Sequence, residues 1–149
     1  MNFMRIHYPV FFFSKKEKQQ IVAAIHRAEK NTSGEIRLHL EYKVRDHVFG
    51  HAKKVFHKIG MTKTEHRNGV LIFLVIKDKK FAVLGDVGIN ERVPDGFWNE
   101  VVEIMQDHFK QDKFAEGISE AIVRIGEKLK AYFPHQANDK NELPDTISY

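Results

Sequence analysis

The chain of 149 residues is close to the usual size of one domain, and its 42% of hydrophobic residues are enough for a single core. It contains no cysteine, which excludes disulfides, thiolate metal sites and cysteine catalysis, and its net charge of +4 at pH 7 combines a basic half, residues 1–85, with an acidic stretch, residues 86–127. No apolar run is long enough for a membrane helix and no secretory signal opens the chain, so we expect a soluble, cytoplasmic protein.

The first predicted helix begins at a capping box over residues 14–17, in which a serine oxygen accepts from an early helix N–H. Turn residues at 31–34 end this helix. Apolar and polar residues then alternate over 35–44, which predicts a strand buried on one face. A second helix follows, with Asp46 as its expected N-terminal cap and Gly60 as its C-terminal stop.

The unbroken apolar run from Val70 to Ile76 is typical of a central strand covered on both faces. The short connection at residues 78–79 predicts a tight hairpin into a returning strand over 81–84. A glycine-containing loop, residues 85–96, then leads to two further helices with apolar stripes.

The order helix, strand, helix, strand, strand, helix, helix predicts the fold. A strand–helix–strand unit of this length normally forms a right-handed parallel crossover, and the hairpin adds an antiparallel strand. We therefore expect a single α/β/α sandwich over residues 1–134, a mixed sheet with helices on both faces. The polar residues 135–149 are expected to form a disordered tail.

This topology brings several polar loops to one rim of the sheet, where Asp86 should lie opposite about Leu71. Carboxylate and amide oxygens in such loops suit a hard cation such as Ca²⁺ or Mg²⁺, although the same residue types are common in ordinary loops. Just upstream, Arg67 could contact a phosphate. The candidate metal ligands are Asp86, Asn68, Asn90, Glu35 and Glu91.

Other patterns favour simpler interpretations. His47 and His51 lie one helical turn apart but share their face with lysines, so we interpret them as a solvated face and not as a zinc site. The lysines within residues 15–18 lack interleaved aromatic residues, and we do not expect nucleic-acid binding.

The acidic helices within residues 98–127 offer a docking face for a basic protein partner. We expect the chain itself to be a monomer.

Four motifs occur in order over the stretch from Gly34 to Phe133. They are Ser33-Gly34-Glu35-Ile36, Arg67-Asn68-Gly69-Val70-Leu71, Gly85-Asp86-Val87-Gly88-Ile89-Asn90 and Phe114-Ala115-Glu116-Gly117-Ile118. Their order and spacing resemble the TPM domain, the family of thylakoid-lumen acid phosphatases, photosystem II repair proteins and acetylcholine-receptor modulators.

The resemblance implies an α/β/α sandwich and a divalent-cation site, often for Ca²⁺, at the loops grouped above. Two positions depart from the family pattern, because Arg67 stands where Asp is usual and Asn90 stands where Glu is usual. Fewer carboxylates and an added cation should weaken metal binding. We therefore expect a TPM-like domain with a modest-affinity Ca²⁺ or Mg²⁺ site and weak or no catalysis. The alternatives are a metal-assisted acid phosphatase and a protein-interaction module without a metal.

Overall fold

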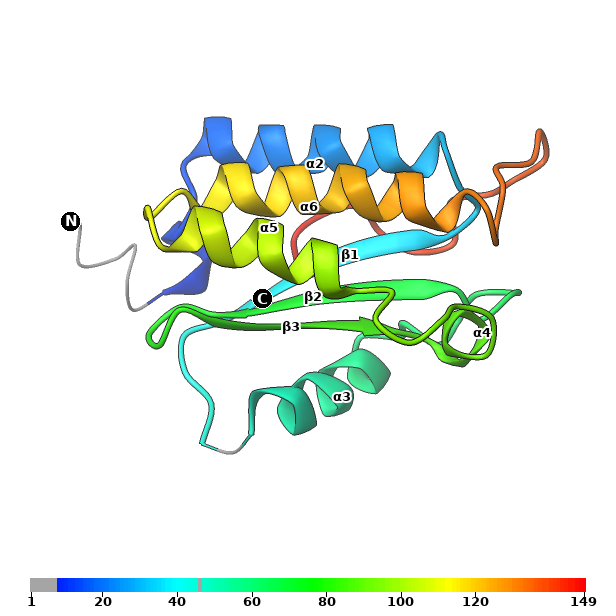
Figure 1. Ribbon diagram of the computed structural model, residues 1–149. Coiled ribbons are helices and arrows are strands. Elements are labelled where there is room, and N and C mark those ends of the chain that lie inside the picture. Colours follow the sequence, from blue (N-terminus) through cyan, green and yellow to red (C-terminus); the bar gives the residue numbers. More distant parts are fainter. Residues whose placement is uncertain (1–7, 46) are drawn as a thin grey trace.

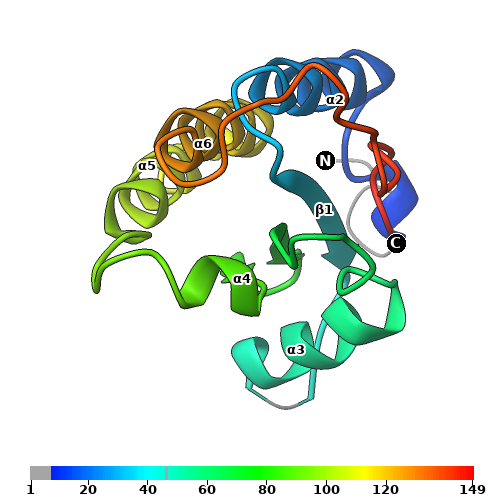
Figure 2. The same ribbon diagram turned by 90° about the vertical axis from the view of Figure 1, so that its right-hand side faces the viewer.

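The computed structural model describes residues 8–45 and 47–149, which form a three-layered fold (Figure 1). In chain order the elements are a 3₁₀ helix (Pro9–Phe11), α2 (Lys15–Glu29), β1 (Glu35–Glu41), α3 (Val48–Lys58), β2 (Gly69–Val75), β3 (Lys80–Gly85), α4 (Val87–Asn90), α5 (Asn99–Phe109) and α6 (Phe114–Leu129). Helices α2, α5 and α6 cover one face of the sheet, and α3 covers the other (Figure 2). The predicted α/β/α sandwich is confirmed.

The sheet has the strand order β1-β2-β3. β1 and β2 are parallel, with Glu35 opposite Gly69, and β2 and β3 are antiparallel, with Val70 opposite Gly85. The Asp86 N–H donates to the Gly69 carbonyl at 3.0 Å, so Asp86 lies at the same rim as the starts of β1 and β2. The parallel crossover, the hairpin and the position of Asp86 within two residues of Leu71 are as predicted.

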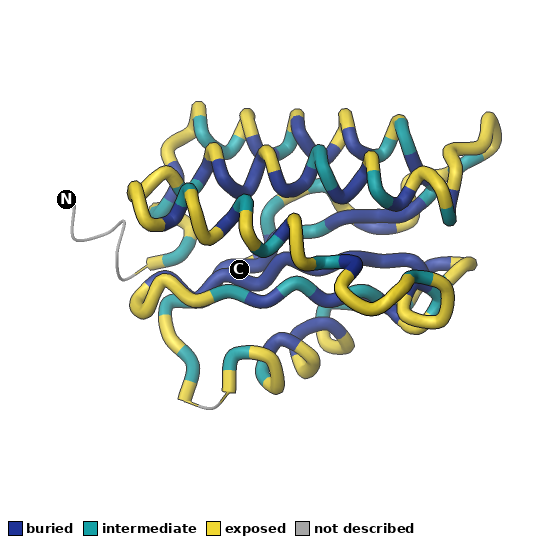
Figure 3. The backbone as a smooth tube through the Cα atoms, viewed as in Figure 1, coloured by how far each residue is buried: buried dark blue, intermediate teal, exposed yellow. Residues whose placement is uncertain are grey.

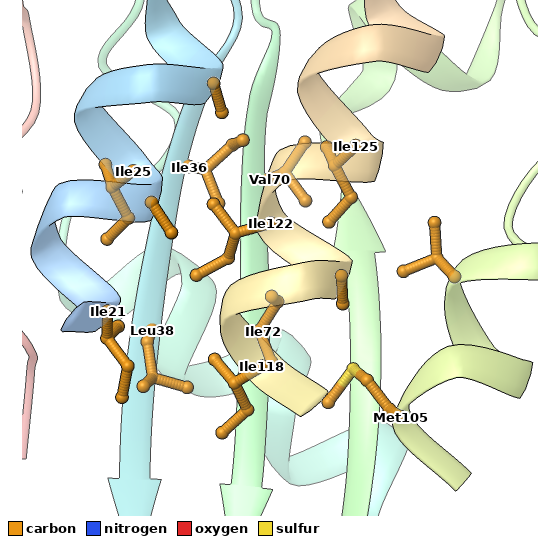
Figure 4. Close-up of a cluster of buried hydrophobic side chains, with 14 of the residues drawn as sticks. Ile21, Ile25, Ile36, Leu38, Val70, Ile72, Met105, Ile118, Ile122 and Ile125 are labelled. Atoms are coloured by element: carbon orange, nitrogen blue, oxygen red, sulfur yellow. The ribbon is translucent and has the colours of Figure 1, made fainter. Parts of the chain in front are cut away.

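The core follows from the alternation of side chains along β2, whose residues are all buried. One face of β2 packs with β1 beneath α2, α5 and α6, and the other face packs against α3. Each large apolar side chain in such a core stabilises the fold by about 1.5–3 kcal/mol relative to its exposed form. Figure 4 labels the first cluster, whose members include Ile21, Ile25, Ile36, Leu38, Val70, Ile72, Met105, Ile118, Ile122 and Ile125.

Local signals at the helix ends also behave as the sequence predicts. The Ser14 Oγ accepts from the Glu17 N–H at 3.1 Å, and the Ser14 N–H donates to the Glu17 carboxylate at 2.8 Å, which completes the capping box. Gly60 ends α3 with a φ of +80°, a conformation that glycine adopts without strain. The expected cap Asp46 lies outside the described residues, and His47 occupies the N-cap position of α3.

Two expectations differ from the structure. β1 was expected to be buried on one face only, but Glu35 and His39 on its polar face are each 3% exposed, and the strand is largely dark blue in Figure 3. The loop over 85–96 contains the short helix α4, because the Asp86 Oδ1 accepts from the Val87 N–H at 2.8 Å and caps a helical turn there.

The C-terminal segment, residues 135–149, explains the burial of β1. We call this segment the C-terminal strap. The sequence predicts a disordered tail here, whereas the structure places the strap along the outer edge of β1 (orange to red in Figure 1). The Ser148 N–H donates to the Leu38 carbonyl and the Leu40 N–H donates to the Ser148 carbonyl, both at 2.9 Å. Leu143 is 6% exposed, so this apolar side chain anchors a segment that is mostly polar in composition.

None of the helices in the described part of the chain combines the length and the apolar character that crossing a lipid bilayer would need.

Candidate ligand site at the sheet rim

An ion pair between Arg67 and Asp86 lies at the rim where β2 begins and β3 ends. The Arg67 Nε donates to the Asp86 Oδ2 at 2.7 Å, and Nη2 donates to Oδ1 at 2.9 Å, so the pair is bidentate. The Asp86 side chain is 4% exposed, whereas that of Arg67 is 43% exposed. The carboxylate is therefore built into the fold, and its cationic partner reaches it from the surface.

The backbone of the loop before β2 places Arg67 for this contact. Arg67 has a φ of +50°, in the left-handed region, and its N–H donates to the Thr64 carbonyl at 3.2 Å. The Gly88 N–H donates to the Arg67 carbonyl at 2.9 Å and ties α4 to the same loop. A Cβ on Gly88 would lie 2.2 Å from the His66 carbonyl oxygen, so only glycine permits this close approach.

The electrostatics of the pair favour a permanent charge on Arg67. Hydrogen bonding to Asp86 raises the pKa of Arg67 above its ordinary value, so the guanidinium stays protonated. The buried carboxylate receives three donors in total, two from Arg67 and one from the Val87 N–H. A buried charge with this many hydrogen bonds is compensated without a bound ion.

The predicted ligands are not gathered around one point. Asn90 lies at the rim with Asp86, but its Nδ2 donates to the Gly85 carbonyl at 3.0 Å. Asn68 is 1% exposed, and its Nδ2 donates to the Ser33 Oγ at 3.3 Å. The Asn68 amide therefore links two neighbouring loops, whereas the Asn90 amide bonds within the segment that follows β3.

The two glutamates of the predicted set do not contact Asp86. Glu35 faces the C-terminal strap, where its Oε1 accepts from the Leu143 N–H at 2.7 Å. Glu91 follows α4 and is exposed. The described residues contain no group of three or more His, Asp or Glu side chains placed to hold a metal ion. With Arg67 on Asp86, the rim as it stands does not fit a divalent cation.

A cleft of about 430 Å³ opens beside the ion pair, between α3 on one side and β3 and α4 on the other. Phe49 and Val87 at its border are 52% and 47% exposed and add apolar surface to the cleft. We call this hollow the rim cleft. Its lining includes Phe49, Lys53, His57, Arg67, Val87 and Trp98.

Sequence reasoning missed the contribution of α3 to this cleft. Phe49 lies outside the apolar stripe of α3 that packs on the sheet, and an aromatic residue off that stripe was the available signal. The face that we interpreted as solvated carries His47 and His51, whereas Lys53 and His57 lie with Phe49 on a different side of α3 that the sequence did not single out. Only the packing of α3 against β3 shows that this side borders a cleft with Arg67.

Some of the acidic residues on α5 and α6 form ion pairs with an arginine of the same two helices. The Arg124 guanidinium donates to the Glu100 carboxylate at 2.9 and 3.0 Å and to the Glu127 carboxylate at 2.8 Å. Exposed pairs of this kind contribute little to stability, but they reduce the net negative charge of the surface. Docking of a basic partner on α5 and α6 stays a prediction.

Comparisons with known proteins bear on the family and the fold. A family model described as the TPM domain matches residues 10–128. The chain is similar to the BA42 protein from the psychrophilic bacterium Bizionia argentinensis, with a TM-score of 0.88 and 46% identity over 92% of this chain and 94% of that one. The N-terminal domain of a P. gingivalis protein has a TM-score of 0.68 and 18% identity, over 85% and 82% of the two chains, and shows the fold alone. No curated protein matches the chain.

Proposed function

The chain belongs to the TPM domain family, and from that premise we propose that its rim cleft binds a small organic anion of the phosphate-monoester type, with Arg67 as the principal contact. The observation that carries this proposal is the bidentate ion pair at the side of the cleft. Asp86 takes the Nε and Nη2 donors of Arg67 and fixes the plane of the guanidinium, which leaves Nη1 to a ligand. A guanidinium held in this way suits the planar recognition of phosphate or carboxylate oxygens.

The rest of the cleft defines the class of anion. Lys53 and His57 add positive or protonatable groups from α3, and Phe49 and Trp98 add aromatic surface. The Lys53 Nζ lies 4.9 Å from the centre of the Phe49 ring, so the cationic and aromatic groups are adjacent. Such a lining favours a ligand with an anionic head and an apolar or aromatic body over a bare inorganic ion.

The direct test is an NMR titration with phenyl phosphate, with inorganic phosphate as the comparison ligand. We expect chemical-shift changes at Arg67, Asp86 and Lys53, and stronger binding of phenyl phosphate than of phosphate. The variant Arg67→Asn tolerates the left-handed backbone and removes the guanidinium, so it should bind at least about tenfold more weakly, because a charge-assisted contact is lost.

Lys63→Asn is the matched control, because it removes one positive charge from the same loop outside the lining of the cleft. It should leave the affinity almost unchanged. Equal weakening in both variants would mean that the anion senses only net charge, and shifts confined to other surfaces would place binding elsewhere. Either result would contradict the proposal.

A second candidate is the divalent cation that the family resemblance implies, and the exposure of Arg67 favours it. The Asp86 carboxylate is buried, but its charge partner is a surface side chain that could be exchanged for an ion. Arg67→Asp would supply the carboxylate that is usual in the family and should bind Ca²⁺ at least about tenfold more tightly than the wild type, because the ligand charge becomes more negative. The measurement is the shift of residues 67–69 and 85–91 during a Ca²⁺ titration. A variant that stays unresponsive at millimolar Ca²⁺ would exclude this candidate.

The enzymatic alternative, a metal-assisted acid phosphatase, has its own signature. It would release phosphate from phenyl phosphate in a metal-dependent way, and Asp86→Asn would abolish that release. Turnover that survives this substitution would have to come from another site.

A further inference from the structure

Three carboxyl groups meet where the C-terminal strap crosses the start of β1. Glu29 comes from the last turn of α2, Glu35 from β1 and Asp145 from the strap. The Ile36 N–H donates to the Glu29 Oε2 at 3.3 Å, and the Leu143 N–H donates to the Glu35 Oε1 at 2.7 Å. The strap is thus fixed to the fold through groups that are negatively charged at neutral pH in water.

The hydrogen-bond donors of the cluster do not reach all of its carboxylate oxygens. The Asp145 Oδ1 and the Glu35 Oε2 are both buried without a hydrogen-bond partner. Glu29 and Asp145 lie within hydrogen-bonding reach of each other, but two ionised carboxylates have no proton to share. A proton on Glu29 would supply the donor that Asp145 lacks and would remove one of two adjacent like charges.

The basic groups around the cluster do not replace that proton. The His26 Nε2 lies 2.7 Å from the Asp145 Oδ2, but the imidazole is 57% exposed and is charged only when protonated. Glu142 in the strap adds another carboxylate and accepts from the Glu65 N–H at 3.1 Å. Arg37 is the next side chain on that face of β1, and its charge helps to lower the pKa of His39. Among the described residues, no lysine or arginine forms an ion pair with Glu29, Glu35 or Asp145.

We propose that the C-terminal strap is a proton-controlled latch, held on β1 by a proton shared between Glu29 and Asp145 and released when that proton is lost. The latch is independent of the rim cleft and of the function proposed for it. The strap lies beyond the residues matched by the TPM family model, which end at 128, whereas Glu29 lies among them.

The strap has a fixed start and a second fastening near its end. The Ser33 N–H donates to the Phe133 carbonyl at 2.9 Å, just before the strap. At the far end the Ser148 Oγ lies 2.7 Å from the His39 Nδ1, and the His39 Nε2 lies 3.1 Å from the Glu41 Oε1. These contacts among Ser148, His39 and Glu41 attach the end of the strap to β1. Ser148 is 9% exposed, and its N–H and carbonyl are both hydrogen-bonded to β1.

The direction of the pH response follows from burial. Burial, and then the charge of Asp145, raises the pKa of Glu29 from 4.5 to about 9, and burial raises the pKa of Glu35 to about 7. The docked strap therefore keeps a proton that the released strap loses, so the contribution of Glu29 to docking is greatest below about pH 4.5 and falls as the pH rises towards 9. One such proton weakens docking by up to about tenfold for each pH unit in this window.

Amide hydrogen exchange of the full chain tests the latch. We expect the protection factors of the Leu143 and Ser148 amides, corrected for intrinsic exchange, to fall by up to about tenfold per pH unit between pH 6 and 9. The amides of β2 serve as the internal reference and should keep their protection. Protection of the strap that stays constant over this range, or that falls only together with β2, would overturn the proposal.

Two variants and a control locate the proton. Glu29→Gln places a permanent N–H donor beside Asp145, and its strap should keep its protection through pH 9. Asp145→Asn changes the same pair from the strap side and should also flatten the pH dependence, even if Glu29→Gln disturbs α2. Asp139→Asn removes a carboxylate from the strap where it accepts from the Gln136 N–H at 2.6 Å, away from the cluster, and should retain the wild-type response. A wild-type response in both pair variants would show that another group carries the proton.

Discussion

The rim and the strap each contain an aspartate with a buried carboxylate oxygen, but they balance its charge by different means. Asp86 at the rim is bound by a guanidinium that remains charged at every accessible pH. Asp145 in the strap has a second carboxyl group, Glu29, as its neighbour, and only the exposed imidazole of His26 as a basic partner. A permanent cation makes the rim a constant feature of the fold, whereas a shared proton makes the strap responsive to pH.

The two arrangements also differ in what can replace the partner. The Arg67 side chain is 43% exposed, so dissolved ions can reach its guanidinium. The proton proposed between Glu29 and Asp145 lies at the edge of β1, where a rise in pH or opening of the strap would remove it. The rim should therefore respond to ligands, and the strap to pH.

The largest loss of stability should come from a substitution that separates α4 from the backbone of the loop before β2. Gly88→Ala places a Cβ 2.2 Å from the His66 carbonyl oxygen and 2.6 Å from that of Arg67, so α4 must move away from the loop. We expect a loss of about 3 kcal/mol in the free energy of unfolding, because neither neighbour is a flexible side chain. Urea denaturation measures the loss.

Gly50→Ala is the control for this substitution, since a Cβ there meets only the His47 Cβ at 4.0 Å. It lies in α3, where alanine should stabilise the helix by up to about 1 kcal/mol. If Gly88→Ala proved as harmless as Gly50→Ala, α4 would not pack against the loop as described.

A smaller effect should follow from loosening the strap. Leu143 is 6% exposed and packs in the cluster beneath α3, so Leu143→Ala should lower the free energy of unfolding by about 2 kcal/mol at pH 6. At pH 9 the loss should be smaller, because a released strap no longer buries the leucine. Denaturation at the two pH values measures both numbers. A loss below about 0.5 kcal/mol at pH 6, the size expected of an exposed residue, would show that the strap does not pack on the sheet.

The smallest effect concerns the far end of the strap in acid. Burial is the main cause that lowers the pKa of His39 below 6.5, and Glu41 opposes it in part. The released state therefore binds a proton that the docked state excludes, and docking at Ser148 should weaken as the pH falls below about 6.5, by at most about tenfold per pH unit. Exchange of the Ser148 and Leu143 amides between pH 4 and 6.5 separates the two ends of the strap. Ser148 should lose protection first, and a simultaneous loss would show that His39 is not the group involved.

The sequence by itself determined the elements that depend on local signals. The capping box at Ser14, the stop at Gly60 and the apolar run of β2 need only neighbouring residues, and each was predicted correctly. Chain order and the handedness of the crossover then gave the sandwich and brought Asp86 to the correct rim. The residue types at that rim also suggested a divalent-cation site, and that site stays a prediction.

Only the tertiary structure decided how the charged groups are paired. Arg67 contacts Asp86 across 19 positions of sequence, and Leu143 contacts Glu35 across 108. Composition cannot reveal such partners, so residues 135–149 looked like a polar tail and the odd-numbered side chains of β1 looked solvated. The physical reason is that burial of a carboxylate depends on what covers it and on which donor reaches it, and both are properties of the folded chain.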